Sequence, residues 1–452
     1  MSRTPTHLAG AMFGTEPMAS VFSGESFVRH MLAFEAALAR AEARAGVIPE
    51  QAAEQIAAVC QVELFDVATI FQEAARSGTP VIPLTRLLTE RIQGDGTKYV
   101  HWGATSQDAI DTALVLQMRD GLTLLDEGLL KLAAGCAALA ERHRHTVMAG
   151  RTVMQQALPI TFGLKAARWL AMVCRQTRAL RDVQTQALVV QFGGAAGTLA
   201  SLGDQGLSVS KEIAAELGLG EPDLPWHTER DRIAAVATTL GVLAGAIGKV
   251  AADILLLAQS EVGEVSEAAE PGRGGSSTMP QKRNPVDAME AAAAARLAIG
   301  LVPVILSGMV QEHERAAGGW QAEWAALPDL FCYTAGALDR VRSAVAGLEV
   351  DAERMRANLT LTRGLIMAES LSMALARHLG REQAHQIVQT LSHRAISQGQ
   401  DLQRAALADD RIRTVLSAGA IERALDPSAY LGSTNTFIDR ALQSYREIEQ
   451  EG

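Results

Sequence analysis

Hydrophobic residues recur at helical spacing along most of the chain. Between Met118 and Leu139 they follow one another in steps of four and three residues, and the same spacing returns between Ile233 and Leu257. This heptad-like spacing places the apolar side chains along one face of a helix, as is typical of long helices in a bundle. Three more long helices are predicted, over residues 159–190, 285–310 and 319–345. Helices of this length favour association with further copies of the chain.

Shorter helical patterns lie on both sides of the long helices. Before residue 109, the amphipathic segment Met31–Arg40 is the clearest of them. Other short helices are predicted there over 50–58, 67–75 and 84–93, the last after an extended connection at 77–84. After residue 350, the predicted helices cover 368–378, 381–398, 401–406, 411–415 and 433–450. Residues 192–226 start with a glycine-rich run and are predicted to form a hairpin-like excursion.

These elements predict an all-α chain in three parts. We expect an N-terminal helical domain over residues 1–108, a central domain of five long helices over 109–350, and a C-terminal helical domain over 351–452. The composition agrees, because 48% of the residues are hydrophobic but only 4% are aromatic. The helices are therefore expected to pack closely on small side chains.

Charge and cysteine usage exclude several classes of function. The net charge is −10, with both signs mixed and no basic run, which argues against a nucleic-acid surface. An anionic substrate would therefore need a local basic pocket. The four cysteines are far apart and form no CxxC pair, which indicates a reducing compartment. No signal-peptide pattern is evident, and the apolar segment 233–258 contains Lys249 and Asp253. We expect a cytoplasmic protein in which this segment is a buried bundle helix.

Three separated segments place hydroxyl groups, cations or glycines at the starts of long helices. In the first, residues 101–112, the run Thr105-Ser106-Gln107-Asp108 has the pattern of a capping box. Its hydroxyls and free N–H groups suit a carboxylate ligand, although an ordinary helix start explains them as well. His101 fits either a ligand contact or a half-buried, hydrogen-bonded histidine.

The second segment, residues 151–163, carries Gln155 in a mostly apolar run. Gln155 suits either a hydrogen bond within the core or a contact with a substrate. The third segment, residues 272–285, combines glycines, hydroxyls and cations, and ends in Asn284-Pro285, which is predicted to cap the next helix. A serine hydroxyl becomes a base only where cations and N–H donors stabilise its alkoxide, and Lys282 can supply such a field. An ordinary glycine-rich linker is the alternative.

Together these segments resemble the three signature regions of the fumarase/aspartase superfamily, which includes argininosuccinate and adenylosuccinate lyases. Residues 275–285 resemble its signature loop almost residue for residue, and 101–112 and 151–163 resemble its other regions in order and spacing. The resemblance spans nearly the whole chain. It implies an all-α, fumarase/aspartase-like three-domain fold and a homotetramer whose active sites each draw on three subunits. It also implies that the enzyme uses no metal and no other cofactor.

The resemblance implies roles for individual residues as well. Ser276 would be the base that takes a proton from the carbon beside a carboxylate, and Lys282 and Asn284 would stabilise the enolate-like carboxylate that forms. The other candidate substrate contacts are His101, Thr105, Ser106, Arg151, Gln155 and Ser277. Arg273 and Arg315 are candidates for further carboxylates, although both also fit ordinary surface charges.

Two departures from the superfamily pattern narrow the expected reaction. The lyases carry a histidine where this chain has Val153, and a glutamate, fourteen residues past the loop glycine, where it has Met289. That pair helps an amine or hydroxide to leave with a proton. A carboxylate, with a pKa of about 4, leaves without such help, so the opening or closing of a lactone fits.

Segments 78–84, 226–232 and 312–324 resemble the 3-carboxy-cis,cis-muconate cycloisomerases of this superfamily. In the place of two polar features of adenylosuccinate lyases, a His-Asp pair and an arginine, this chain has Pro80–Pro83 and Trp324, so a nucleotide phosphate is not expected. The resemblance thus implies an intramolecular lyase that interconverts 3-carboxy-cis,cis-muconate and 4-carboxymuconolactone in protocatechuate catabolism, the β-ketoadipate pathway. Its substrate would be a small tricarboxylate, with no nucleic-acid or membrane partner.

Two alternatives stay open. The first is a superfamily lyase that releases fumarate, as adenylosuccinate and argininosuccinate lyases do, and Val153 and Met289 argue against it. The second is a catalytically silent relative that serves as a structural oligomer. The intact loop argues against a silent relative, because such a chain needs no Ser276, Lys282 and Asn284 together.

Overall fold

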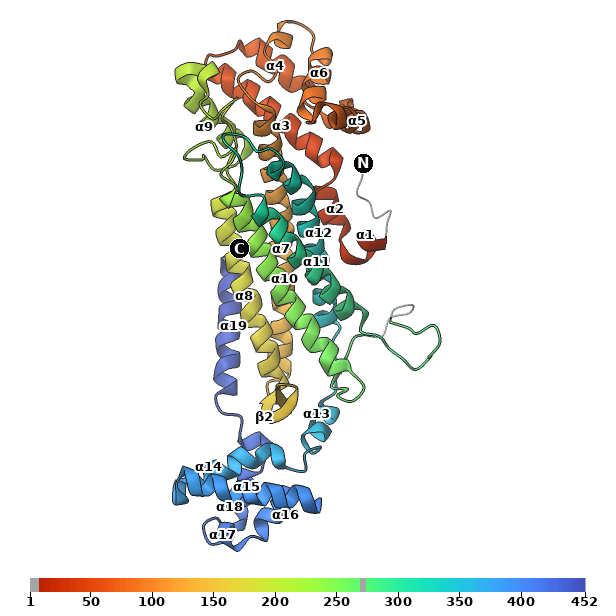
Figure 1. Cartoon of the computed structure of the whole chain (residues 1–452), viewed down its shortest axis with the longest axis vertical. Helices are drawn as coiled ribbons and strands as arrows, with labels where there is room; N and C mark the ends of the chain where they lie inside the picture. Colours follow the sequence, from red (N-terminus) through yellow and green to blue (C-terminus); the bar gives the residue numbers. More distant parts are fainter. Residues whose placement is uncertain (1–7, 269–273, 452) are drawn as a thin grey trace. The chain divides into compact units, whose positions relative to one another are not determined.

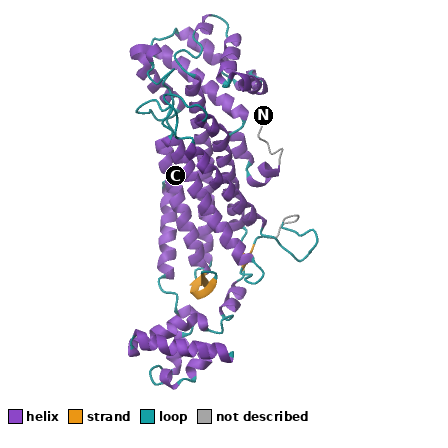
Figure 2. Cartoon of the chain, viewed as in Figure 1, coloured by secondary structure: helices purple, strands orange, loops and turns teal. Residues whose placement is uncertain are grey.

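The structure is a computed structural model that describes residues 8–268 and 274–451. Helices dominate it, and the described strands form two small antiparallel pairs (Figures 1 and 2). The chain divides into two compact units, each built from three segments. Unit 1 comprises Met1–Leu129, Gln176–Lys249 and Met289–Val341. Unit 2 comprises Leu130–Arg175, Val250–Ala288 and Arg342–Gly452. The division into three consecutive domains stays a prediction.

The five predicted long helices are present, and the boundaries of the two units fall inside them (Figure 1). They are α7 (Ser106–Arg142), α8 (Phe162–Ala187), α10 (Asp231–Ala258), α11 (Val286–Ser307) and α12 (Gly319–Ala346). By length and composition alone, α10 and α11 could cross a membrane. Half of the most apolar window of α10 is already buried within this single chain, as expected for a bundle helix.

Glycines spaced seven residues apart let the long helices approach closely. A methyl group added at Gly121 of α7 would lie 3.0 Å from the Phe331 ring of α12, and one at Gly128 would lie 2.8 Å from Leu338. The same arrangement continues in unit 2, where a methyl group added at Gly135 would lie 3.0 Å from the Val345 side chain. Helix α10 meets α11 in the same way in unit 1, through glycines 241 and 248. At these points the backbone of one long helix therefore packs against a larger side chain of its neighbour.

Unit 1 also contains the N-terminal helices and a compact excursion between α8 and α10. Its helices before α7 are α1 (Leu8–Phe13), α2 (Glu16–Val21), α3 (Gly24–Arg44), α4 (Glu50–Val59), α5 (Val67–Ser77) and α6 (Val81–Arg91), with 3-10 turns at Val62–Leu64 and Asp95–Lys98. The excursion holds a 3-10 turn (Ala200–Gln205) and α9 (Gly206–Leu217). Its buried Phe192 packs near Phe34 of α3 in one hydrophobic cluster.

Two predictions for unit 1 are wrong. Helix α6 begins at Val81 and not at Leu84, because Pro83 falls in the first turn, where a missing N–H costs no intrahelical hydrogen bond. The excursion over 192–226 is not hairpin-like. It is largely helical, and the one described bridge near it joins Val189 and Gly220 in parallel.

In unit 2, a β-hairpin precedes α8. Strand β1 (Val147–Thr152) pairs antiparallel with β2 (Gln155–Thr161), and the left-handed Val153 and Met154 form the turn. The prediction that the second long helix begins near Pro159 is therefore wrong, since α8 begins at Phe162. Pro159 is tolerated because β2 is the edge strand of a two-stranded sheet.

Apart from β3, the remaining elements of unit 2 follow α12 in sequence. A second strand pair joins β3 (Val265–Ser266) to β4 (Glu349–Val350). The helices that follow are α13 (Ala352–Leu359), α14 (Ala368–Leu379), α15 (Arg381–Gln398), α16 (Leu402–Leu407), α17 (Asp410–Arg413), α18 (Ala418–Ala424) and α19 (Thr434–Gln450), with 3-10 turns at Leu365–Met367 and Pro427–Ala429. Helices α13 and α18 were not predicted, although Asp351 and Ser417 cap them as the sequence would suggest.

Glu42 places a fully buried carboxyl group in the core of unit 1. Its side chain lies on the buried face of α3, and neither carboxyl oxygen has a hydrogen-bond partner among the described residues. Burial, followed by repulsion from Glu35, raises the pKa of Glu42 from 4.5 to about 9. The group is therefore protonated in the folded chain at neutral pH.

This raised pKa predicts that stability falls with rising pH. Between pH 4.5 and 9 the folded chain holds a proton on Glu42 that the unfolded chain releases, so each pH unit costs about 1.4 kcal/mol of unfolding free energy. Glu42→Gln removes this dependence. We expect the variant to gain stability over the wild type steadily from pH 5 to pH 8, as measured by urea unfolding at one protein concentration. The exposed Glu54→Gln variant serves as the control, and parallel curves for Glu42→Gln and the wild type would contradict the expectation.

Candidate active site

The start of α7 brings together two candidate residues in unit 1. The Thr105 N–H donates to Oδ2 of Asp108 over 3.0 Å, which is one half of the predicted capping box. The other half is replaced, because the hydroxyl of Thr105 accepts a hydrogen bond from Nη1 of Arg315 at 2.8 Å. Arg315 also donates through Nη2 to the carbonyl of Ala195 at 3.0 Å, and its Nε is buried without a partner among the described residues. Arg315 is therefore part of the Thr105 site and not an ordinary surface charge.

Asp108 holds this site to the excursion that follows α8. Its fully buried carboxylate accepts hydrogen bonds from the N–H groups of Gly193 and Gly194 at 3.0 and 2.9 Å. It also accepts one from Nε2 of Gln191 at 3.1 Å, and Nε2 of His227 lies 2.8 Å from Oδ1. The sequence marked Asp108 only as a helix cap, whereas the structure shows it fixing the backbone beside Thr105.

A second buried charge network lies one turn further along α7. Arg230 pairs with both carboxylate oxygens of Asp111, at 2.7 and 3.0 Å, and with those of Glu323, at 3.1 and 2.6 Å. Nε1 of Trp320 donates to Asp111 at 2.9 Å, and Nε2 of Gln107 donates to the same carboxylate at 3.0 Å. Burial alone would lower the pKa of Arg230, but Asp111 and Glu323 raise it above its usual value. This network joins α7, the residue just before α10, and α12, and no sequence pattern indicates which of these residues pair.

The second signature segment forms the hairpin in unit 2. Arg151 makes a two-pronged ion pair with the buried Glu264, at 2.7 and 2.9 Å, and Asn358 donates to the same carboxylate at 2.8 Å. Gln155 is exposed beside the turn, and Val153 is 93% exposed. Since Glu264 already neutralises Arg151, this arginine anchors the hairpin in the single chain. Its contact with a substrate, like that of Gln155, stays a prediction.

The signature loop, also in unit 2, is closed by its own backbone. The Asn284 N–H donates to the carbonyl of Gly274 at 2.7 Å, and Gly275 forms an antiparallel bridge with Arg283. Gly274 adopts φ 69°, and a Cβ there would lie 2.7 Å from the carbonyl oxygen of Asn284, so this position needs glycine. The candidate Arg273 lies outside the described residues. Figure 2 shows the described part of this segment mainly as loop.

Within this loop, Ser276 receives two backbone hydrogen bonds. The N–H groups of Met279 and Thr278 donate to its Oγ over 3.0 and 3.4 Å. Two donors at one oxygen fix its position and stabilise negative charge on it. Lys282 is exposed, and its ammonium has no ion-pair partner in the part of the chain that the structure describes. Ser277 is exposed as well and lies 3.5 Å, Oγ to Oγ1, from Thr278.

Glu267, and not Asn284, satisfies the first N–H groups of α11. Its carboxylate accepts hydrogen bonds from Asp287 at 3.1 Å and from Ala288 at 2.8 Å. The prediction that Asn284 caps this helix is therefore wrong. A carboxylate fits a helix start better than an amide, because it also neutralises the positive end of the helix dipole. The Asn284 side chain is left without that role.

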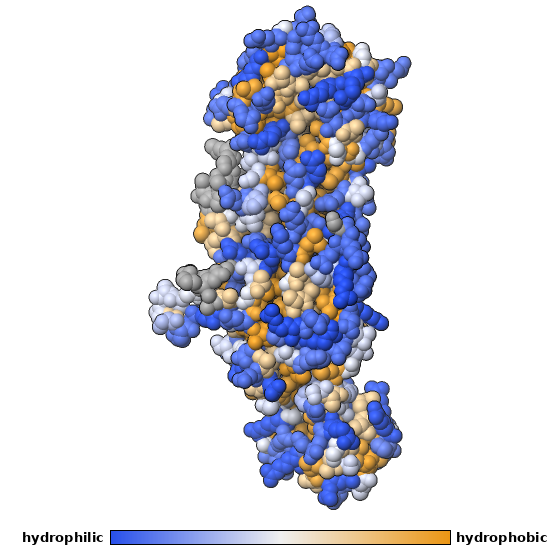
Figure 3. Space-filling view, turned by 180° about the vertical axis from the view of Figure 1, so that it is seen from behind, coloured by the Kyte–Doolittle hydropathy of each residue, from blue (hydrophilic) through white to orange (hydrophobic). Residues whose placement is uncertain are grey.

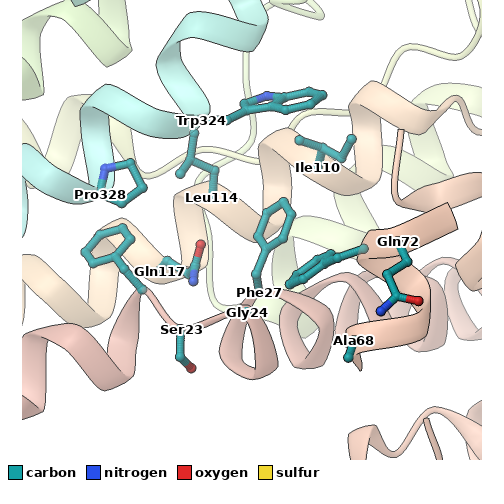
Figure 4. Close-up of a pocket in the computed structure, with 12 residues that line it drawn as sticks. Ser23, Gly24, Phe27, Ala68, Gln72, Ile110, Leu114, Gln117, Trp324 and Pro328 are labelled. Atoms are coloured by element: carbon teal, nitrogen blue, oxygen red, sulfur yellow. The ribbon is translucent and has the colours of Figure 1, made fainter. Parts of the chain in front are cut away.

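A cavity of a different character lies elsewhere in unit 1 (Figure 4). Its volume is about 490 Å³, and aromatic and aliphatic side chains around Phe27, Leu114 and Trp324 line it. No lining residue carries a charge, so the cavity does not suit a tricarboxylate. Trp324 meets the ring of Trp320 edge-on at 4.9 Å. Among the residues described, no group of three or more His, Cys, Asp or Glu is arranged to hold a metal ion.

Comparison with known proteins identifies the family. A family model described as lyase matches residues 13–300, and one described as adenylosuccinate lyase C-terminus matches residues 364–441. The chain belongs to the fumarase/aspartase superfamily. The predicted membership and the mostly helical fold are thus confirmed, and the superfamily consists of lyases and related enzymes.

Several superfamily members are similar over almost their full length. The 3-carboxy-cis,cis-muconate cycloisomerase of Pseudomonas aeruginosa is 48% identical over 99% of this chain and 98% of its own. The crystal structure of 3-carboxy-cis,cis-muconate lactonizing enzyme from Pseudomonas putida matches with a TM-score of 0.92 at 42% identity, covering 98% of this chain and 99% of that one. The nitrosuccinate lyase of Streptomyces davaonensis is 39% identical over 94% of this chain and 92% of its own. Relatives of similar identity thus act on different substrates.

Proposed function

We propose that the chain is a 3-carboxy-cis,cis-muconate cycloisomerase, which interconverts the open tricarboxylate diene and 4-carboxymuconolactone in protocatechuate catabolism. The observation that carries this proposal is the combination of a complete signature loop with apolar residues at the two leaving-group positions, Val153 and Met289. A lactone carboxylate leaves without a proton donor, so such an enzyme has no need of the missing pair. The similarity to cycloisomerases over full length supports the same conclusion.

The proposed reaction moves one proton at carbon. One substrate carboxylate attacks the diene within the same molecule, and the electron pair of the broken double bond moves toward a neighbouring carboxylate. Lys282 and Asn284 stabilise the charge that develops there. Ser276 donates its hydroxyl proton to carbon and regains a proton from solvent; in the reverse direction the same oxygen removes the proton. The two N–H donors on Ser276 Oγ support this role, because they stabilise the oxygen when it is negative.

Substrate binding, in this proposal, uses cations and hydroxyls of the signature segments and Arg315. Arg315 and Thr105, which are already hydrogen-bonded to each other, bind one substrate carboxylate by donating hydrogen bonds to it together with Ser106. Lys282 serves another carboxylate, and its lack of a described ion pair supports that role. The reaction as written needs no metal and no cofactor, since these side chains supply the positive charge that a Lewis acid would otherwise provide.

We further propose a homotetramer whose active sites are shared between subunits. Large apolar side chains on the α10 and α11 portions of unit 1 stay exposed in the single chain. They are Val242, Met289, Leu297, Ile299, Val304 and Leu306. Hydrophobic areas also appear on the face of the molecule that Figure 3 shows. Exposed apolar residues grouped on two long helices favour burial against further copies. Light scattering should give four times the mass of one chain. The four cysteines are free, which agrees with a cytoplasmic location.

One assay tests the proposed reaction against its alternatives. The purified protein is mixed with 3-carboxy-cis,cis-muconate, and loss of the conjugated diene is followed by ultraviolet absorbance. Parallel reactions measure fumarate release from adenylosuccinate, argininosuccinate and nitrosuccinate. We expect diene loss with no fumarate. Fumarate release without diene loss would identify a different lyase of the superfamily, and neither reaction would indicate a silent relative.

A further inference from the structure

His101 and Glu35 form a close pair at the edge of the proposed site. Nδ1 of His101 lies 2.6 Å from Oε1 of Glu35, which projects from α3. The Glu35 side chain is only 1% exposed, whereas that of His101 is 17% exposed. The imidazole therefore separates a buried carboxylate from a surface that a ligand can reach.

The surroundings of Glu35 make His101 its main counter-charge. In the described chain, His101 is the one residue that forms an ion pair with Glu35, and Oε2 of Glu35 has no hydrogen-bond partner. Glu35 also acts electrostatically on Glu42, two turns along α3, and on the thiol of Cys60, and neither group offers a positive charge. Arg40 acts on the same thiol, but its guanidinium is ion-paired with Glu216. A buried carboxylate needs a partner that carries a positive charge, so this geometry favours the imidazolium form of His101.

The backbone at His101 is held in an uncommon conformation. Its φ is 56°, in the left-handed region that favours glycine. Such a residue persists only where its surroundings enforce it, which is frequent at functional sites. Here the Glu35 contact fixes the side chain. Tyr99 and Trp102, which flank the residue in sequence, pack against each other at 5.8 Å between ring centroids.

The second ring nitrogen of His101 is available for a ligand. Nδ1 is occupied by Glu35, and Nε2 has no hydrogen bond to any described residue. Four residues further along, Thr105 is hydrogen-bonded to Arg315. Burial lowers the pKa of His101, but Glu35, by charge and hydrogen bond, and then Asp108 outweigh this and raise it. The structure thus leaves Nε2 of His101 unoccupied in the same signature segment as the Thr105 hydroxyl, which is hydrogen-bonded to Arg315.

We propose that Glu35 is a positioning residue, which clamps Nδ1–H of His101 and so presents Nε2–H to one carboxylate of the tricarboxylate substrate. The proposal rests on the function proposed above and deepens it. It makes His101 a third cationic contact, beside Arg315 and Lys282, for a substrate with three carboxylates. Glu35 itself touches no ligand in this proposal. Its buried carboxylate changes substrate affinity only through its effect on His101.

The test compares Glu35→Gln with Glu42→Gln, a change of the other buried carboxyl group on α3. KM and kcat for 3-carboxymuconate are measured from pH 5.5 to 9 in both variants and the wild type. In the wild type, KM should rise as pH passes the pKa of His101. Glu35→Gln should raise KM at pH 7 by about tenfold, the size of one charge-assisted hydrogen bond, with kcat nearly unchanged. It should also shift the rise in KM to lower pH, while Glu42→Gln leaves the profile in place.

A binding measurement keeps this test separate from the proposed reaction. Calorimetry with propane-1,2,3-tricarboxylate requires no turnover, and we expect weaker binding by Glu35→Gln and by His101→Gln at pH 7. His101→Gln should also remove the pH dependence. No binding by the wild type, or the same pH dependence in the wild type and Glu35→Gln, would overturn the proposal. A wild type that binds the tricarboxylate as expected but leaves the diene intact would instead reject the proposed reaction alone.

Discussion

Ser276→Ala is expected to lower kcat for lactone formation by roughly 10²- to 10⁴-fold, the range for loss of a group that transfers a proton in the transition state. KM should change little, because Lys282, Arg315 and Thr105 remain to bind the carboxylates. The fold should be unaffected, since the Ser276 hydroxyl accepts hydrogen bonds only from the exposed loop backbone. Steady-state kinetics followed by diene absorbance measure kcat and KM, and circular dichroism measures whether the fold is retained.

Ser277→Ala provides a matched control in the same loop. Its hydroxyl has no backbone N–H donor among the described residues, so we expect a change in KM without a comparable loss of kcat. If both variants lost activity equally, loop conformation and not proton transfer would explain the effect. If Ser276→Ala kept near-normal turnover with its fold intact, the serine would not be the acid/base.

Arg230→Met is expected to lower the free energy of unfolding by about 3–5 kcal/mol, as found when one partner of a buried ion pair is removed. The substitution leaves the carboxylates of Asp111 and Glu323 buried without their cation. It also removes the guanidinium that stacks 5.0 Å from the Trp226 ring. Urea unfolding of the wild type and the variant at equal concentration measures the loss.

Two comparisons make this prediction specific to the buried network. Arg232→Met breaks a pair with Asp223, whose side chain is 80% exposed, and should cost much less stability, because solvent screens the pair. Adding Asp111→Asn and Glu323→Gln to Arg230→Met removes the stranded charges and should restore part of the lost stability. A cost for Arg230→Met no larger than that for Arg232→Met would show that the network contributes little.

The sequence predicted the long helices well because each carries one apolar face over many turns. Helices α10 and α12 begin and end within about two residues of the expected bounds. The β1–β2 hairpin was missed, since its strands are short and its turn uses Val153 and Met154, which rarely adopt left-handed conformations. The predicted start of α6 was three residues too late, because proline usually interrupts a helix and Pro83 was therefore placed before the first turn.

The sequence indicates candidate site residues only where a contiguous motif carries them, as for residues 274–285 and Thr105, and their roles stay predictions. The side chains that hold these residues in place pair with distant segments; Asp108, for example, contacts His227. Helical spacing in the sequence does not indicate which segments meet. The sequence does carry one indication of a buried polar pair. Glu35 and Glu42 lie seven residues apart on the apolar face of α3. Charged residues in such a position indicate either a buried pair or a shifted proton.

The seven-residue glycine spacing along α7 has a consequence for how this chain tolerates mutation. Glycine in a helix interior costs about 1 kcal/mol relative to alanine, so Gly121 and Gly128 each make α7 a poorer helix on its own. Closer contact with Phe331 and Leu338 of α12 must offset that loss. Alanine, the residue most often substituted to strengthen helices, would place its methyl group 3.0 Å from Phe331 at position 121 and 2.8 Å from Leu338 at position 128. The gain in helix propensity is therefore set against displacement of a side chain on the neighbouring helix.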